Sequence, residues 1–198
     1  MAKAAWCTVN PTQGSGNVTV NVSATAHTGR SQRTTTLTFS ATGVAAKTVS
    51  VPQSAKAEFV TLNDVSAAKG GGTVTMTGTS NSSKLTFALG SGDISVSLPG
   101  SYSAAGASTA NAAAIAGDPG AAAQFDFSIQ FSVPANTTIN AKSKVITVTA
   151  AGGQSDSGTI SQAAGDPTLS VSPTSVTLDA AGTAKAVTVT SNTNWTVS

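Results

Sequence analysis

Short runs in which apolar and polar residues alternate recur along most of this chain. Residues 17–24 read NVTVNVSA, and residues 34–41 read TTTLTFSA. A period of two places alternate side chains on one face of a β-strand, whereas an amphipathic helix requires a period of 3.6. The sequence contains no amphipathic run long enough for three helical turns. The alternation therefore predicts an all-β protein.

Loops rich in Gly, Asn, Ser and Thr separate these runs at short intervals, which is typical of antiparallel sandwiches. Further strands are predicted at 47–53, 73–79, 84–89, 93–98, 125–133, 144–150 and 158–162. A chain of 198 residues has room for one large domain or for two domains of about 100 residues each. We predict two immunoglobulin-like antiparallel β-sandwiches.

One segment interrupts the regular spacing of the predicted strands. Residues 101–124 are rich in Ala and Gly and read SYSAAGASTANAAAIAGDPGAAAQ, with room for one short helix near 112–116. A sandwich loop of this length is usually functional or mobile. Two interpretations stay open, a mobile surface loop and an ordered contact with another subunit.

The two ends of the chain each hold only part of a sandwich. Residues 167–198 contain two or three predicted strands and stop soon after Trp195, so they cannot bury a core alone. Residues 1–56 hold the later strands of a sandwich and lack the earlier ones. Read in the order 167–198 and then 1–56, the two ends form one continuous domain.

The chain is therefore divided into three parts. Residues 1–57, here called the head, are the C-terminal part of a split sandwich. Residues 58–165, the central sandwich, form a second domain that carries the insertion 101–124. Residues 166–198, the tail, supply the N-terminal strands of the split sandwich.

Taken in this permuted order, tail and head resemble the BACON domain, the Bacteroidetes-associated carbohydrate-binding, often N-terminal module. The shared motifs are a W-T-V strand, a W-x-x-V-x-P-x-x-G-x-G stretch, a strand that begins with Arg, and a closing V-x-V-x-Q. The matching positions are Trp195, Thr196, Val197, Trp6, Val9, Pro11, Gly14, Gly16, Arg33, Leu37, Phe39, Val49, Val51 and Gln53. The central sandwich matches more loosely, because Leu85 and Ile94 stand where the family has tryptophan.

The split sandwich can close in two ways, onto the tail of the same chain or onto the tail of a neighbouring subunit. Short linkers favour the neighbour, because a sandwich with an odd number of strands sends its two ends to opposite poles. The predicted donor side chains of the tail are Val176, Leu178, Val187, Val189, Trp195 and Val197. The predicted acceptor core of the head consists of Trp6, Val18, Val20, Val22, Leu37, Phe39, Val49 and Val51.

Composition argues against several classes of function. Charged residues make up 9% of the chain and the net charge is +2, so a nucleic-acid partner is not expected. Neither a membrane-spanning run nor a secretory leader is visible. His27 lacks partners at catalytic or metal-binding spacing, and the single cysteine, Cys7, is predicted to be buried. We expect no enzyme activity, no catalytic residues, no metal and no cofactor.

The resemblance implies a function in one of two classes. BACON domains occur in phages of gut Bacteroidetes, including the crAss-like group. This implies a virion protein, either a capsid decoration or a tail component, made in the bacterial cytoplasm. Such a protein would assemble by strand exchange with copies of itself and with other virion proteins such as the major capsid protein.

The family name implies instead a carbohydrate- or mucin-binding module. Sugar-binding modules usually present exposed aromatic rings, and Tyr102 is the candidate, because Trp6 and Trp195 fall in the predicted composite core. A third interpretation is a fragment of a longer tandem array.

Overall fold

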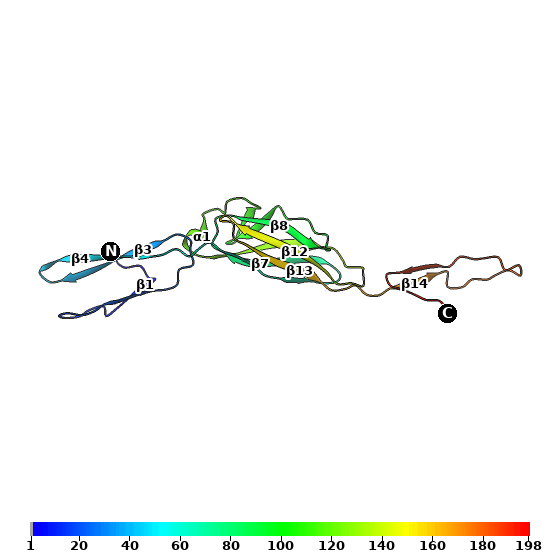
Figure 1. Cartoon of the computed structure of the whole chain (residues 1–198), viewed down its shortest axis with the longest axis horizontal. Coiled ribbons are helices and arrows are strands. Elements are labelled where there is room, and N and C mark those ends of the chain that lie inside the picture. Colours follow the sequence, from blue (N-terminus) through cyan, green and yellow to red (C-terminus); the bar gives the residue numbers. More distant parts are fainter. Residues whose placement is uncertain (1) are drawn as a thin grey trace.

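The computed structural model describes residues 2–198 and is built almost entirely of β-strands (Figure 1). Head, central sandwich and tail follow one another along an elongated molecule, with the head at one end and the tail at the other. The predicted all-β class is confirmed. Within residues 2–198, no helix has both the length and the apolar character needed to cross a bilayer.

The head consists of two separate two-stranded antiparallel sheets. The first pairs β1 (Cys7–Asn10) with β2 (Asn21–Ala24), and the second pairs β3 (Arg33–Ala41) with β4 (Val44–Gln53). Cys7 and Leu37 are buried. Many other apolar side chains of the head are exposed, namely Val18, Val22, Phe39, Val44 and Val49. The head thus has two facing pieces of sheet but only part of a core.

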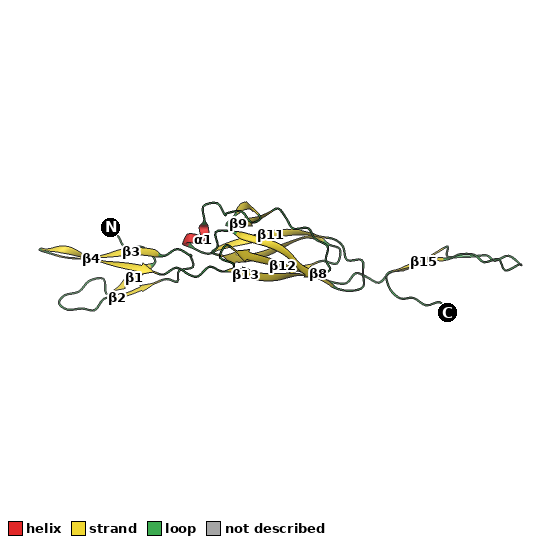
Figure 2. Ribbon diagram, turned by 45° about the horizontal axis from the view of Figure 1, so that its top comes forward, coloured by secondary structure: helices red, strands yellow, loops and turns green. Residues whose placement is uncertain are grey.

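The central sandwich is a closed domain of two sheets (Figure 2). One sheet has the strand order β10-β9-β11-β7-β5 and the other has the order β6-β13-β12-β8. The bounds are β5 (Val60–Leu62), β6 (Val65–Ala67), β7 (Gly72–Ser80), β8 (Leu85–Gly92), β9 (Ser101–Ala104), β10 (Ala107–Ala110), β11 (Phe125–Val133), β12 (Lys142–Ala150) and β13 (Ser155–Gln162). Strand β11 shows the predicted alternation fully, because every second side chain from Phe125 to Val133 is buried.

The segment 101–124 is not a loop, and this part of the sequence-based prediction is wrong. It forms the β9–β10 hairpin, which extends the five-stranded sheet beside β11, and then the helix α1 (Pro119–Ala122). The small residues of this segment hide its alternation, in which Tyr102 and Ala104 point into the core. The helix expected near 112–116 is absent and begins instead at Pro119, whose fixed φ suits a first helical turn.

Residues 93–98 form no strand, contrary to the prediction. The amides of Asp93 and Ile94 both donate to the carbonyl of Ser143, at a bulge in the β8–β12 pairing. Gly92 still pairs with Lys144 beyond the bulge, and the β8–β12 ladder ends there, before residues 93–98.

The tail is a single antiparallel hairpin of β14 (Leu169–Ser172) and β15 (Thr188–Ser191). The strands predicted around Val176 to Leu178 and from Trp195 to Val197 do not form within this chain. Within residues 2–198 of this chain, the hairpin has no second layer to pack against and no further strand beside its outer edges. Its apolar side chains are consequently exposed, namely Leu169, Val171, Val176, Leu178, Val187, Trp195 and Val197.

Candidate binding sites

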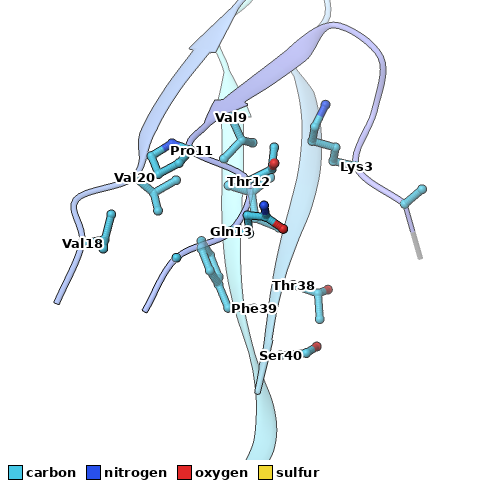
Figure 3. A pocket seen from close by; sticks show the side chains of 13 residues that line it. Lys3, Val9, Pro11, Thr12, Gln13, Val18, Val20, Thr38, Phe39 and Ser40 are labelled. Atoms are coloured by element: carbon cyan, nitrogen blue, oxygen red, sulfur yellow. The ribbon is translucent and has the colours of Figure 1, made fainter. Parts of the chain in front are cut away.

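A pocket with both apolar and polar lining residues opens between the two sheets of the head (Figure 3). It encloses about 470 Å³. Val9 of β1, Phe39 of β3, and Val18 and Val20 of the segment before β2 surround the hollow, and Gln13 and Thr38 supply polar groups at its rim. Its walls include the exposed apolar side chains of Val18 and Phe39, which the head does not cover by itself.

The central sandwich shows what would cover this pocket. Strands β3 and β4 repeat the register of β12 and β13, because Arg33 pairs with Gln53 as Lys142 pairs with Gln162. Phe39 of the head therefore corresponds to Val148 of the central sandwich, which lies 109 positions later in the sequence. Val148 is completely buried, whereas Phe39 is 41% exposed. The difference arises because the head lacks counterparts of the strands β5 to β8.

The tail hairpin repeats the pairing of β5 with β7. Val60 faces Ser80 in the central sandwich, and Leu169 faces Ser191 in the tail. The hydroxyl of Ser80 donates to the carbonyl of Phe59 at 2.7 Å, and that of Ser191 donates to the carbonyl of Thr168 at 2.8 Å. The tail hairpin thus shares its strand register and its serine–carbonyl hydrogen bond with the β5–β7 pair of the central sandwich.

Asn81 lies at the junction between the head and the central sandwich and is completely buried. Its Oδ1 accepts a hydrogen bond from the amide of Phe59 at 2.9 Å. Its Nδ2 donates to the carbonyls of Thr28 and Ala57, both at 3.2 Å. One side chain therefore ties together a head loop, the linker and the end of β7.

Asn192 makes the same three bonds at the junction between the central sandwich and the tail. Its Oδ1 accepts from the amide of Thr168 at 2.8 Å. Its Nδ2 donates to the carbonyls of Thr137 and Asp166 at 2.8 and 2.9 Å. Each partner lies 109 positions beyond its counterpart, from 59 to 168, from 28 to 137 and from 57 to 166. The two junctions are therefore built in the same way.

Other contacts reinforce these junctions. At the first, the amides of Arg30 and Ser31 donate to the carbonyls of Gly120 and Ala121 in α1, and the Arg30 guanidinium pairs with Asp118. At the second, the Lys69 ammonium lies 2.7 Å from a carboxylate oxygen of Asp166 on an exposed surface. An exposed pair of this kind contributes little to stability, so the hydrogen bonds between the Asn192 side chain and main-chain groups hold the second junction.

A polar groove crosses the outer face of the five-stranded sheet. Two adjoining hollows of about 420 and 580 Å³ share Ser103, Gly106 and Ser128. Gly78, Pro99, Tyr102 and Phe127 also line the hollows. Their other lining residues carry hydroxyl, amide or carboxylate groups, namely Asn63, Thr77, Thr79, Ser101, Ser108, Asp126 and Gln130. These two hollows form a concave surface on the outer face of the central sandwich.

The sequence of the head matches a known family model. The match spans residues 1–54, and the model is described as “BACON: Putative binding domain, N-terminal”. We therefore call residues 1–54 the BACON segment, after the model that they match. This match confirms the family predicted from the motifs, and the matched residues coincide with the open head.

Comparison with curated proteins gave no match. Among solved structures, the endo-fucoidan hydrolase MfFcnA4 from glycoside hydrolase family 107 aligns over 82% of this chain with 13% identity and a TM-score of 0.28. A variant of that enzyme aligns over 81% with 14% identity and a TM-score of 0.27. This chain spans 22% of the length of either enzyme, and at such TM-scores neither fold nor function is inferred from the likeness.

The predicted donor and acceptor side chains lie at opposite ends of the molecule, so the tail does not close onto the BACON segment of its own chain (Figures 1 and 2). Of the donors, Val189 is half-buried, and Trp195 and Val197 are 49% and 83% exposed. Of the acceptors, Leu37 is buried. The half-buried acceptors are Trp6, Val20 and Val51, and the exposed ones are Val18, Val22, Phe39 and Val49.

Tyr102 does not lie in an exposed loop as predicted. It is 4% exposed and packs against Phe87, with 5.0 Å between the ring centroids. Its ring is therefore not available as a stacking platform for a sugar. Trp6 is half-buried and carries the Arg33 guanidinium 4.6 Å above its ring.

Sequence reasoning missed several residues of these sites. Leu169 and Val171 belong to the exposed face of the tail, and their alternation in PTLSVSP was a visible signal. The repeated Ser-Asn pairs at 80–81 and 191–192 were visible as well, but not their three-bond networks. No group of three His, Cys, Asp or Glu side chains that could hold a metal occurs within residues 2–198.

Proposed function

We propose that this protein is a non-catalytic carbohydrate-binding protein built from tandem BACON-type sandwiches. The observation that carries the proposal is the BACON match over residues 1–54, a family whose model is described as a binding domain. The polar groove of the central sandwich supports it, because its chemistry suits sugar hydroxyls, each of which donates and accepts hydrogen bonds.

The groove residues come from three adjacent strands. Ser128 of β11 faces Thr77 of β7 on one side and Ser103 of β9 on the other. Asp126, two residues before Ser128, lies on the same outer face and adds a charged acceptor, whose hydrogen bonds are stronger than those of neutral groups. The side chains are therefore spaced along and across the sheet, as an extended oligosaccharide requires.

The aromatic side chains at this groove, Tyr102 and Phe127, are buried beneath it. Recognition by hydrogen bonds alone gives weak binding in water, on the order of a millimolar Kd for a single site. Several copies on one surface would raise the apparent affinity.

The test is a screen of neutral and acidic oligosaccharides followed by calorimetric titration of the best ligand. Ser128→Ala removes a hydroxyl from the groove and should weaken binding about tenfold, the effect of one lost hydrogen bond. Ser132→Ala removes the same group from the same outer face of β11 outside the groove, and should change nothing. A screen without a ligand, or equal losses in both variants, would overturn the proposal.

A structural role is the second candidate. The observation in its favour is the pair of open, complementary faces on the head and tail. The virion context expected from the sequence draws no support from the fold or from the comparisons, which leaves it a prediction. Proteomic detection of the chain in purified phage particles would test it.

A further inference from the structure

We infer that the tail of one copy completes the BACON segment of a second copy, so that chains join head to tail. The completed unit would be a sandwich of the same kind as the central one. The inference is independent of glycan binding, because the groove lies on the central sandwich.

The tail exposes side chains at positions that a closed sandwich buries. Val171 of β14 corresponds to Leu62 of β5, because the two hairpins share one register. Val171 is 47% exposed and Leu62 is 6% exposed. The motif L-T-F in β8 and its counterpart W-T-V in the tail show the same contrast, since Trp195 is 49% exposed and Leu85 is completely buried.

The BACON segment exposes the complementary positions. The side-chain amide of Gln53 donates to the carbonyl of Thr25, as that of Gln162 donates to the carbonyl of Pro134. The same offset of 109 positions equates Val22 with Phe131. Val22 is 43% exposed, whereas Phe131 is completely buried.

The central sandwich supplies the register of the contact. Phe87 faces Val148 across β8 and β12, so Val197 of the tail would face Phe39 of the second copy. Met76 faces Ile129 across β7 and β11, so Val187 would face Val20 of the second copy. The tail residues 183–187 and 195–197, which form no strand in the single chain, would then join its sheets.

Side-chain volumes differ in both directions between the split sandwich and the central core. The head carries Val18, Val20 and Val22 where the central sandwich has Phe127, Ile129 and Phe131. The tail carries the larger Trp195 where the central sandwich has Leu85. Cores tolerate such exchanges when the total volume is kept.

The partner is a second copy rather than the same chain. Head and tail lie at opposite ends of the molecule, with the whole central sandwich between them (Figure 1). Because the contact joins different surfaces, it is heterologous, and a rotation that does not close produces an open filament. The matching Asn81 and Asn192 junctions mean that each added copy repeats the previous geometry.

The experiment uses the 198-residue chain in analytical ultracentrifugation over a range of concentrations. Val171→Asp places a charge on the donor face, and Val22→Asp places one on the acceptor face. Both residues are exposed in the single chain, so neither change should unfold it. The controls Ser170→Asp and Ser23→Asp alter the neighbouring residues, which are exposed and point to the opposite faces of the same strands.

The wild type and both controls should form larger species as concentration rises. Val171→Asp alone and Val22→Asp alone should each need at least roughly 100-fold higher concentration than the wild type to associate, because a buried unpaired charge opposes the contact. Mixed one to one, the two variants should form a discrete heterodimer, because one intact tail and one intact head remain. A monomeric wild type, a variant that associates like the wild type, or a mixture that stays monomeric would overturn the inference.

Discussion

At the scale of single residues, Asn81 holds the junction between the head and the central sandwich together. It lies completely buried where three pieces of main chain meet, and satisfies one amide and two carbonyls there. A buried main-chain group without a partner costs free energy comparable to a lost hydrogen bond. The side chain therefore positions the head by satisfying groups that water cannot reach.

Asn81→Ala should lower the free energy of unfolding by about 2–4 kcal/mol, because it leaves several buried main-chain groups without a hydrogen-bond partner. Asn192→Ala removes the same three bonds at an exposed junction, where water replaces them, and should cost less than about 1 kcal/mol. Urea unfolding of both variants measures the difference. Equal losses would show that burial is not what makes Asn81 important.

Because of Tyr102, the stability of the central sandwich should fall at high pH. Burial raises the pKa of the Tyr102 phenol above its ordinary value of 10.0. The folded state therefore disfavours the phenolate, while the unfolded chain ionises freely. The stability linked to Tyr102 is fully present below about pH 10 and is lost as the pH rises through the raised folded value.

Above about pH 10, the wild type should accordingly lose stability faster than Tyr102→Phe, and the two should keep a constant difference at lower pH. The chain has one tyrosine, so an ultraviolet titration follows this group alone. Unfolding measured from pH 7 to 11 in both proteins gives the comparison. Parallel pH profiles throughout would contradict the assignment.

At the scale of elements, the head rests on α1 through the loop between β2 and β3. Gly29 in this loop is buried against the backbone of Ala121 and Ala122, and a Cβ at Gly29 would collide with it. A clash with main chain cannot be relieved by changing a rotamer. The close approach of the two elements therefore requires glycine at this position.

Gly29→Ala should detach the head from α1 while leaving the central core folded. We expect faster proteolysis within residues 1–56 and a broader distribution of shapes in small-angle scattering, with little change in the melting of the central sandwich. Gly100→Ala is the matched control, because a Cβ there meets no atom within 4 Å. A head that stays equally protected in both variants would argue against the contact.

At the scale of the whole molecule, the main core is confined to the central sandwich. All members of the large buried cluster lie between Val60 and Ile160. Head and tail are too small and too open to bury comparable cores, since units of fewer than about 60 residues are marginal even when closed. Completion by a second copy would convert these two open parts into another folded unit.

Calorimetry should therefore show one concentration-independent transition from the central sandwich and a second transition that grows and moves to higher temperature with protein concentration. Association that occurs only in the folded state stabilises by mass action. Val171→Asp should keep the first transition and lose the second. If wild-type melting does not change with concentration, then head and tail do not stabilise one another.

The sequence by itself determined the strands with clear alternation, such as β3, β7 and β11, because a period of two with β-branched residues has one stable solution. It also predicted that head and tail are complementary parts of one sandwich, and it carries the motifs by which residues 1–54 match the BACON model. These are properties of local pattern and of motif order.

Only the tertiary structure decided where Tyr102 lies and which parts of the chain can meet. In SYSA, alanine and serine differ too little in polarity for the alternation to be seen, so burial depended on the neighbouring strand β11. Residues 176–178 and 195–197 have strand-like patterns but no strand beside them, and an unpaired strand leaves its main-chain groups unsatisfied. The separation of head and tail follows from the length of the sandwich between them, which no local pattern encodes.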